Sequence, residues 1–205
     1  MITSWEPSAQ PSTRERLLSV GLALFAAKGF GATTVGEIEQ AAGLQPRRGG
    51  LYRHFASKEA LLEAAIERQL EAMTGVQNSV LQAPALKPGV AAALFGRWLL
   101  ADLDAQQAMT HLMEREGNRL IALRDRFCAT SQMGFALASQ LIRRWLESSD
   151  LQLDADVAAA VLIGGLINYR RSRWTLGAAP LDLDDEAFLL GFSELAEALF
   201  DKAAP

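Results

Sequence analysis

The sequence predicts an all-α protein. Prolines and glycines fall between the apolar segments, and no run of β-branched residues alternates with polar ones as it would in a strand. Of the 205 residues, 50% are hydrophobic and 21% are charged, which is typical of a globular chain with an ample core. We therefore expect a folded helical protein rather than a disordered chain.

Cysteine content and hydropathy indicate the compartment. The single cysteine, Cys128, excludes an internal disulfide framework and fits a reducing environment. The first residues have neither a basic region nor an apolar stretch, so we expect no secretion signal. The longest apolar run, 157–169, is shorter than the roughly 20 residues of a membrane span. A cytoplasmic protein without a membrane partner is expected.

The stretch 33–59 contains short helical segments in close succession. Thr34 has a Glu three residues later, the spacing of a capping box, and Gly43 ends that helix. Leu51 and Phe55, four residues apart, anchor the next segment to the same small core. Another helix begins at Ser57. Before this stretch, Ser12 begins a helix that ends at Gly29, and after it we expect helices over 57–73, 89–107, 109–117, 120–148, 154–175 and 184–202.

Two short helices joined by a glycine turn predict a helix-turn-helix, whose second helix enters the DNA major groove. Its polar side chains suit this role, because arginines neutralise phosphates or pair with guanine, and a capped helix N-terminus binds phosphate. The alternative is a solvated charged face beside a small helical core. The predicted DNA-binding residues are Thr34, Arg47, Arg48, Gly49, Gly50, Tyr52, Arg53, His54 and Lys58.

The net charge of −4 is unevenly distributed. Residues 1–58 carry seven basic and four acidic side chains, whereas 59–205 carry thirteen basic and twenty acidic ones. A basic end on an acidic body is expected when one end of the protein meets a polyanion. The charge distribution therefore supports the DNA-binding interpretation of the N-terminal part.

Residues 14–62 resemble the N-terminal domain of the TetR-like transcriptional regulators. The matching stretches are 26–30, 33–38, 41–44 and 51–62. The resemblance implies an all-helical homodimer with a three-helix head and a helical ligand-binding body. Such proteins usually repress transcription until a small molecule releases them from a palindromic operator. By position, Thr34, Tyr52, His54 and Lys58 match residues that typically touch the DNA backbone.

One departure from the family pattern lies in the recognition segment. Between Leu44 and Leu51 the family commonly has four residues, and this chain has six, Gln45 to Gly50. We expect Arg47 and Arg48 to contact DNA and Gly50 to begin the close approach, because glycine lets the backbone approach a partner.

The body is expected to bind the effector and to form the dimer. We place the DNA-binding domain at 12–58, a connecting helix at 59–74 and the body at 75–205. Two helices, 154–175 and 184–202, occupy the places of the family's dimer-forming pair, although packing within the chain is the alternative. The predicted interface residues are Ala158, Val161, Gly164, Gly165, Phe188, Phe192, Leu195 and Leu199.

An effector cavity is expected between the head and the dimer helices, because thioethers and aromatic rings suit apolar ligands. The candidate wall residues, which are also compatible with ordinary core packing, are Trp98, Met109, His111, Met113, Phe127, Met133 and Trp174. Ligand binding there is expected to tilt the 57–73 helix and to change the separation of the two heads.

An all-α enzyme is the main alternative function. The sequence has no Gly-x-Ser-x-Gly elbow, no phosphate-binding Gly-Lys-Ser/Thr loop and no dinucleotide glycine fingerprint. With two histidines and one cysteine, a zinc site would need carboxylates, and no Glu-x-x-His pair supports a di-iron bundle. We therefore expect no catalytic residue, metal or cofactor. A protein-interaction module using the acidic body is a third possibility, which no specific motif supports.

Overall fold

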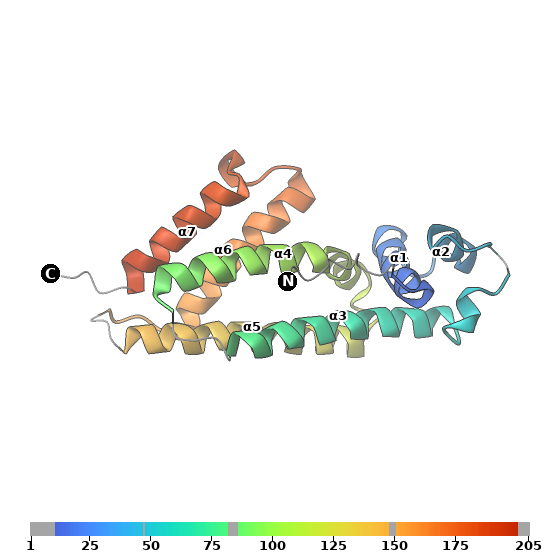
Figure 1. The fold of residues 1–205 in the computed structure, drawn as a ribbon, viewed down its shortest axis with the longest axis horizontal. Coiled ribbons are helices and arrows are strands. Elements are labelled where there is room, and N and C mark those ends of the chain that lie inside the picture. Colours follow the sequence, from blue (N-terminus) through green and yellow to red (C-terminus); the bar gives the residue numbers. More distant parts are fainter. Residues whose placement is uncertain (1–10, 47, 82–85, 148–150, 201–205) are drawn as a thin grey trace, which may run out of the picture. The chain divides into compact units, whose positions relative to one another are not determined.

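The computed structural model describes residues 11–46, 48–81, 86–147 and 151–200, with side chains except at 76–81. Within these ranges all regular structure is helical, which confirms the predicted all-α class (Figure 1). The elements are α1 (Thr13–Lys28), α2 (Val35–Ala41), η1 (Leu51–Arg53), α3 (Lys58–Leu81), α4 (Pro88–Glu116), α5 (Ile121–Leu146), α6 (Ala155–Leu176), η2 (Pro180–Asp182) and α7 (Asp185–Phe200). No helix of the described ranges has the length and apolar character needed to cross a membrane.

The chain forms two compact units. The first comprises 1–69 and 108–124, and the second comprises 70–107 and 125–205. The domain boundary predicted from the sequence, at residue 75, differs from this division. The first unit ends at residue 69 and also includes 108–124, which contain the end of α4 and the start of α5. Helices α3, α4 and α5 therefore each contribute residues to both units.

Several helix starts follow directly from capping residues. Ser12 accepts a hydrogen bond from the Glu15 amide at 3.2 Å, and Thr34 and Glu37 form a complete capping box. Asp154 accepts hydrogen bonds from two backbone amides at the start of α6. Each cap satisfies backbone N–H groups that have no partner inside the helix, and a cap of this kind contributes about 1 kcal/mol.

Two of the expected helix boundaries are wrong. Helix α4 runs without a break from Pro88 to Glu116, where two helices were expected, and α3 continues to Leu81 instead of ending near Met73. Polar residues around 104–107 interrupt the apolar pattern of α4, but this stretch contains neither Pro nor Gly to end a helix. In α3, Gly75 costs about 1 kcal/mol relative to Ala and does not end the helix.

The core of the first unit is built where α1 and α3 approach closely. Leu17, Leu18 and Phe25 of α1 and Leu61 of α3 are fully buried. A Cβ atom at Gly21 would lie 2.8 Å from a methyl group of Leu61, so a larger residue there would force the Leu61 side chain to shift. The packing therefore fixes the scaffold on which α2 and η1 rest.

The end of α4 belongs to the same core. Met109 and Leu112 are fully buried there. Arg115 donates a hydrogen bond to the Ala27 carbonyl at 2.7 Å, and the buried Glu116 accepts one from the Phe30 amide at 3.1 Å. These contacts tie the C-terminal turn of α4 to the C-terminal end of α1.

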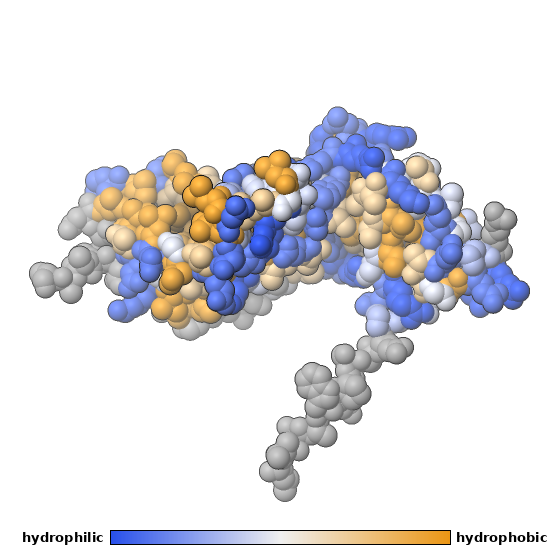
Figure 2. Space-filling model, turned by 90° about the horizontal axis from the view of Figure 1, so that it is seen from above, coloured by the Kyte–Doolittle hydropathy of each residue, from blue (hydrophilic) through white to orange (hydrophobic). Residues whose placement is uncertain are grey.

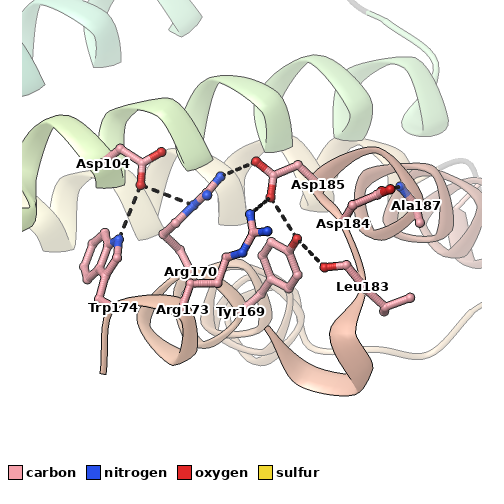
Figure 3. A network of polar contacts seen from close by, with 9 residues as sticks. All are labelled: Asp104, Tyr169, Arg170, Arg173, Trp174, Leu183, Asp184, Asp185 and Ala187. Carbon is pink, nitrogen blue, oxygen red and sulfur yellow. Dashed lines mark hydrogen bonds and ion pairs between the residues drawn. The ribbon is translucent and has the colours of Figure 1, made fainter. Parts of the chain in front are cut away.

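A polar network joins α4, α6 and α7 in the second unit (Figure 3). The buried Arg170 donates to Asp185 at 2.8 Å, and its Nε lies 3.5 Å from Asp104 without hydrogen-bond geometry. The Tyr169 hydroxyl lies 2.8 Å from Asp185, and its ring stacks on Phe188. Burial, together with the hydrogen bond to Asp185, raises the pKa of Tyr169 to about 12. The network fixes the start of α7 against α6.

Candidate DNA-binding and effector sites

The start of α2 is held rigidly at the protein surface. Thr34 is exposed, and its amide and hydroxyl both donate to Glu37, at 2.8 and 2.9 Å. Lys28 donates to the same carboxylate at 2.5 Å. The hydrogen bond from Lys28, together with those from Thr34, lowers the pKa of Glu37 to about 2. Both donors of Thr34 are thus engaged by Glu37, and its contact with a DNA phosphate stays a prediction.

The turn after α2 depends on one buried carboxylate. Gly43 adopts a φ of +74°, which glycine takes without steric cost. Glu39 is 1% exposed, and its Oε1 accepts a hydrogen bond from the Leu51 amide at 3.0 Å. Glu39 therefore joins α2 to the start of η1. Sequence reasoning missed this residue, although an acid between the inward-facing Ile38 and Ala42 was a visible signal.

The recognition segment is a short 3-10 turn rather than an α-helix. It spans Leu51–Arg53 and is followed by hydrogen bonds from the His54 and Phe55 amides to the Leu51 carbonyl. Gly49 has a φ of +71°, which prevents the helix from extending toward the N-terminus. A Cβ at Gly50 would lie 3.0 Å from Leu44, so this backbone packs closely on the turn.

Most of the predicted DNA-binding side chains lie on the surface. Arg48, Tyr52, Arg53 and His54 are exposed, with Tyr52 at 58%, while the neighbouring Leu51 and Phe55 are buried and anchor the segment. Exposed arginines beside a rigid turn can reach phosphates and base edges. Arg47 lies outside the described residues.

Lys58 is engaged inside the first unit. Its ammonium donates to the carbonyls of Phe30 and Thr33, at 2.8 and 2.9 Å, and lies 4.3 Å from the centre of the Phe30 ring. These contacts close the loop between α1 and α2. Lys58 therefore has a structural role that the sequence did not indicate, and its DNA contact stays a prediction.

The second unit contains a partly open apolar cavity of about 150 Å³. Most of its wall comes from α4, α5 and α6, with contributions from Met73 of α3 and from Phe192 and Ala196 of α7. The ring of Phe95 lies 5.5 Å from that of Trp98 on the α4 side. A concave apolar space of this kind is typical of a small-molecule site.

Of the seven predicted wall residues, only Trp98 lines this cavity. Met109 and Met113 are instead buried in the first unit, to which His111 also belongs. Met133 is 48% exposed, and Trp174 hydrogen-bonds to Asp104 at 3.3 Å. Phe127 is half-buried on α5 and is not part of the wall. The apolar character of a residue alone does not show whether it lines a cavity or packs in the core.

Two polar residues of the wall, Asp102 and Gln106, were missed. Gln106 is buried, and its amide donates a hydrogen bond to Asp102. Burial raises the pKa of Asp102 to about 6. The available signal was the helical spacing of Phe95, Trp98, Asp102 and Gln106, which places an acid on the same face as two aromatic rings.

Replacing Asp102 by Asn is expected to stabilise the ligand-free protein at about pH 8. The pKa of Asp102 in the folded protein lies above its unfolded value near 4. The wild type therefore loses stability as the pH rises from about 4 through 6. Asn cannot ionise, so the variant does not have this loss. Partial exposure screens the effect, so we expect a rise of a few degrees in melting temperature. Thermal melts at several pH values test this, and a gain that does not shrink toward about pH 4 would contradict the assignment.

Helices α6 and α7 each present an apolar stripe that is not covered by the rest of the described chain. On α6, Val157 and Val161 are 56% and 67% exposed, and a Cβ at Gly165 would meet nothing within 4 Å. On α7, Leu195 and Leu199 are 51% and 37% exposed. Figure 2 shows hydrophobic residues gathered on the left of the visible face, on the side of the molecule where α6 and α7 lie. Such a surface is typical of a protein–protein interface.

The eight predicted interface residues divide between this surface and the interior. Gly164 and Gly165 lie along the α6 stripe and have no neighbouring atoms that a Cβ would meet. Ala158 is 6% exposed, Phe192 lines the cavity, and Phe188 stacks on Tyr169. The structure therefore directs these last three side chains into their own chain, whereas Val161, Leu195 and Leu199 face outward.

Comparison with known proteins finds similarity to bacterial transcriptional regulators. Residues 17–65 match the family model described as bacterial regulatory proteins, tetR family. The transcriptional repressor KstR2 of Mycolicibacterium smegmatis is 37% identical over 37% of this chain and 36% of its own length. The regulator TcmR of Streptomyces glaucescens is 27% identical over 91% of this chain and 82% of its own length.

The match to the first relatives covers only part of those proteins, since it spans 18% of the regulator YerO of Bacillus subtilis and 36% of KstR2. Solved structures extend the similarity of fold to most of the chain. A tetR-family regulatory protein from Rhodococcus RHA1 has a TM-score of 0.68 at 18% identity, covering 95% of this chain and 100% of that one. Reduced NemR of E. coli has a TM-score of 0.66 at 20% identity, covering 94% and 100%.

Proposed function

Because the chain belongs to the TetR family of bacterial regulatory proteins, we propose that it is a transcriptional repressor that binds a palindromic operator as a homodimer and is released by a small molecule. The relatives with which it shares its N-terminal domain are transcriptional regulators rather than enzymes. In this role the protein acts in the cytoplasm, where its operator DNA lies.

The exposed basic and aromatic segment after α2 is the observation that carries the DNA-binding proposal. Arg48, Tyr52, Arg53 and His54 project from a backbone that Glu39, Leu51 and Phe55 hold in place. Positioned cations supply phosphate contacts, and the same arginines can read guanine in the major groove. A phosphate contact at Thr34 requires its hydroxyl or amide to leave Glu37, because both donate to that carboxylate.

The cavity in the second unit supports the ligand-responsive part of the proposal. Helix α4 contributes wall residues from Ala91 to Gln106, and its last turn bonds to α1 through Arg115 and Glu116. A ligand that favours one position of α4 would therefore alter the contacts of its last turn with α1 in the DNA-binding domain. Such coupling requires a difference in ligand affinity between the two states, because equal affinity shifts no equilibrium.

The apolar stripes of α6 and α7 support a two-fold dimer. A symmetric dimer would present two heads to successive major-groove faces, about 34 Å apart on a palindrome. A second copy of the chain would also account for Gly164 and Gly165, which have no close neighbour within their own chain.

Selection of bound DNA from a random pool tests the proposed function most directly. We expect enrichment of a palindrome with half-sites about one helical turn apart. Recovery of no enriched sequence by the full-length protein would overturn the DNA-binding proposal, and recovery of single, unpaired half-sites would overturn the dimeric part.

Replacing Glu39 by Ala is expected to weaken operator binding about tenfold, because it leaves the buried Leu51 amide without its acceptor. Gln at the same position keeps a carbonyl oxygen and should retain affinity within a few-fold. Electrophoretic mobility shifts with both variants make the comparison. Equal loss in both would indicate that the charge of Glu39, rather than its hydrogen bond to η1, supports DNA binding.

A further inference from the structure

The cavity wall has a single charged group. Among the described residues that line it, Asp102 is the only titratable side chain, and α5, α6 and α7 contribute none. Gln106 and Ser131 are the other polar side chains of the wall, and the remaining wall residues are apolar. The wall thus presents one carboxylate to an otherwise apolar space.

Asp102 differs from the acid two residues further along α4. Asp104 has a cationic neighbour, Arg170, whose Nε lies 3.5 Å away, and it also accepts a hydrogen bond from Trp174 (Figure 3). The recorded partner of Asp102 is the neutral amide of Gln106, which donates to Oδ2. Residues two apart on a helix lie on different faces, so the Arg170 network does not serve Asp102.

A carboxylate in an apolar wall without a cation is costly unless another molecule pairs with it. Asp102 is partly exposed, and an apolar residue beside Trp98, Leu99 and Leu103 would avoid the cost of burying the rest of the carboxylate. A cationic ligand gains both the charge pairing and the apolar contacts. The unbalanced charge therefore indicates the chemistry of the missing partner.

We propose that the cavity binds a compact aromatic or aliphatic amine, with the ammonium group paired with Asp102 and the apolar part against Phe95, Trp98 and Phe135. The proposal rests on the proposed function in taking this ligand as the effector. A ligand carboxylate would meet Asp102 with like charge, and an alcohol would leave the ionised carboxylate without a counter-charge. A cavity of about 150 Å³ holds one benzene ring in an engineered protein, so a single ring with a short chain suits this volume.

Three probes of similar size test the ligand class: phenylpropylamine, phenylpropanol and phenylpropanoate. Isothermal titration of the full chain at about pH 8, where the carboxylate is ionised and the amine protonated, should show the amine binding at least tenfold more tightly than either analogue. Lowering the pH to about 5 should weaken the amine about tenfold, because most Asp102 is then protonated, and should not weaken the alcohol, which no longer faces an unpaired charge.

The variant D102N should abolish the preference for the amine. The matched control is D104N, which removes the same charge from the same helix at a residue outside the wall, and it should retain the preference. Equal or tighter binding of the alcohol or the carboxylate to the wild type would overturn the proposal. So would an amine preference that survives in D102N, or the absence of amine binding at millimolar concentration.

Operator binding by the wild type separates this proposal from the proposed function. If operator DNA is bound and the amine is not, the site proposal fails while the regulator proposal stands. If the amine binds through Asp102 without weakening operator binding, the site stands and ligand-controlled release fails.

Discussion

Replacing both Arg47 and Arg48 by Ala is expected to weaken operator binding at least about 100-fold near 0.1 M salt. Arg48 is exposed directly before Gly49, whose positive φ turns the chain into η1. The contribution of Arg47 is expected from its position in the six-residue segment 45–50, which is two residues longer than is common in the family. Because each arginine is expected to neutralise a phosphate or pair with guanine, the pair should account for a large share of the DNA affinity.

The salt dependence identifies the cause of the loss. Each lost phosphate contact reduces the slope of log K against log salt by about 0.9, and a dimer presents the pair twice, so the slope should become shallower by about 3 to 4. Fluorescence anisotropy over a salt series measures both quantities. The matched control is R143A/R144A, an adjacent exposed arginine pair on α5 in the second unit, which should change neither. Wild-type affinity and slope in R47A/R48A would contradict the assignment of the recognition segment.

Features set by local chemistry could be predicted from the sequence. The caps at Ser12 and Thr34 depend on residues three positions apart, and Gly29 and Gly43 take the positive φ expected where a helix ends. The exposed and buried positions of 51–55 follow from the four-residue spacing of Leu51 and Phe55. Local hydrogen bonding and helical periodicity were therefore sufficient for α1, α2 and the anchoring of 51–55, but not for the 3-10 conformation of Leu51–Arg53.

Features set by tertiary packing could not be predicted in the same way. The engagement of Lys58 with the Phe30 and Thr33 carbonyls joins residues 25 and more positions apart. Whether an apolar side chain faces a cavity or a filled core depends on the neighbouring helices, which is why Trp98 lines the cavity and Met109 does not. The same limit applies to Ala158 and Val161, because α6 is apolar on more than one face.

Replacing Val161 by Glu is expected to convert the dimer into a monomer. Val161 is 67% exposed in the single chain and lies on the α6 stripe with Val157 and Gly165. At a two-fold interface the substitution buries a charge from each subunit, and the penalty for an unpaired buried ion is several kcal/mol. The dimer dissociation constant should therefore rise at least about 1,000-fold, as measured by sedimentation equilibrium.

The matched control for Val161→Glu is Leu94→Glu. Leu94 is 58% exposed on α4 in the same unit, so the substitution adds the same charge at a comparable surface position outside the two stripes. It should leave the dimer intact. Circular dichroism should show native helix content for both variants, because neither side chain is buried within its own chain. A dimer that persists in V161E would contradict the assignment of the α6 stripe.

Loss of the dimer and loss of the recognition contacts should be distinguishable on DNA. The V161E monomer retains intact heads, so its affinity for a single half-site should equal that of one wild-type head, while its gain from a second half-site disappears. R47A/R48A should remain a dimer and bind both the half-site and the palindrome weakly. The palindrome is expected to bind more tightly than a half-site because two linked heads bind with a high effective concentration. This requires the contact between the α6 and α7 stripes of two subunits but no particular arginine. A V161E monomer that binds the palindrome as tightly as the wild type would show that the heads act independently.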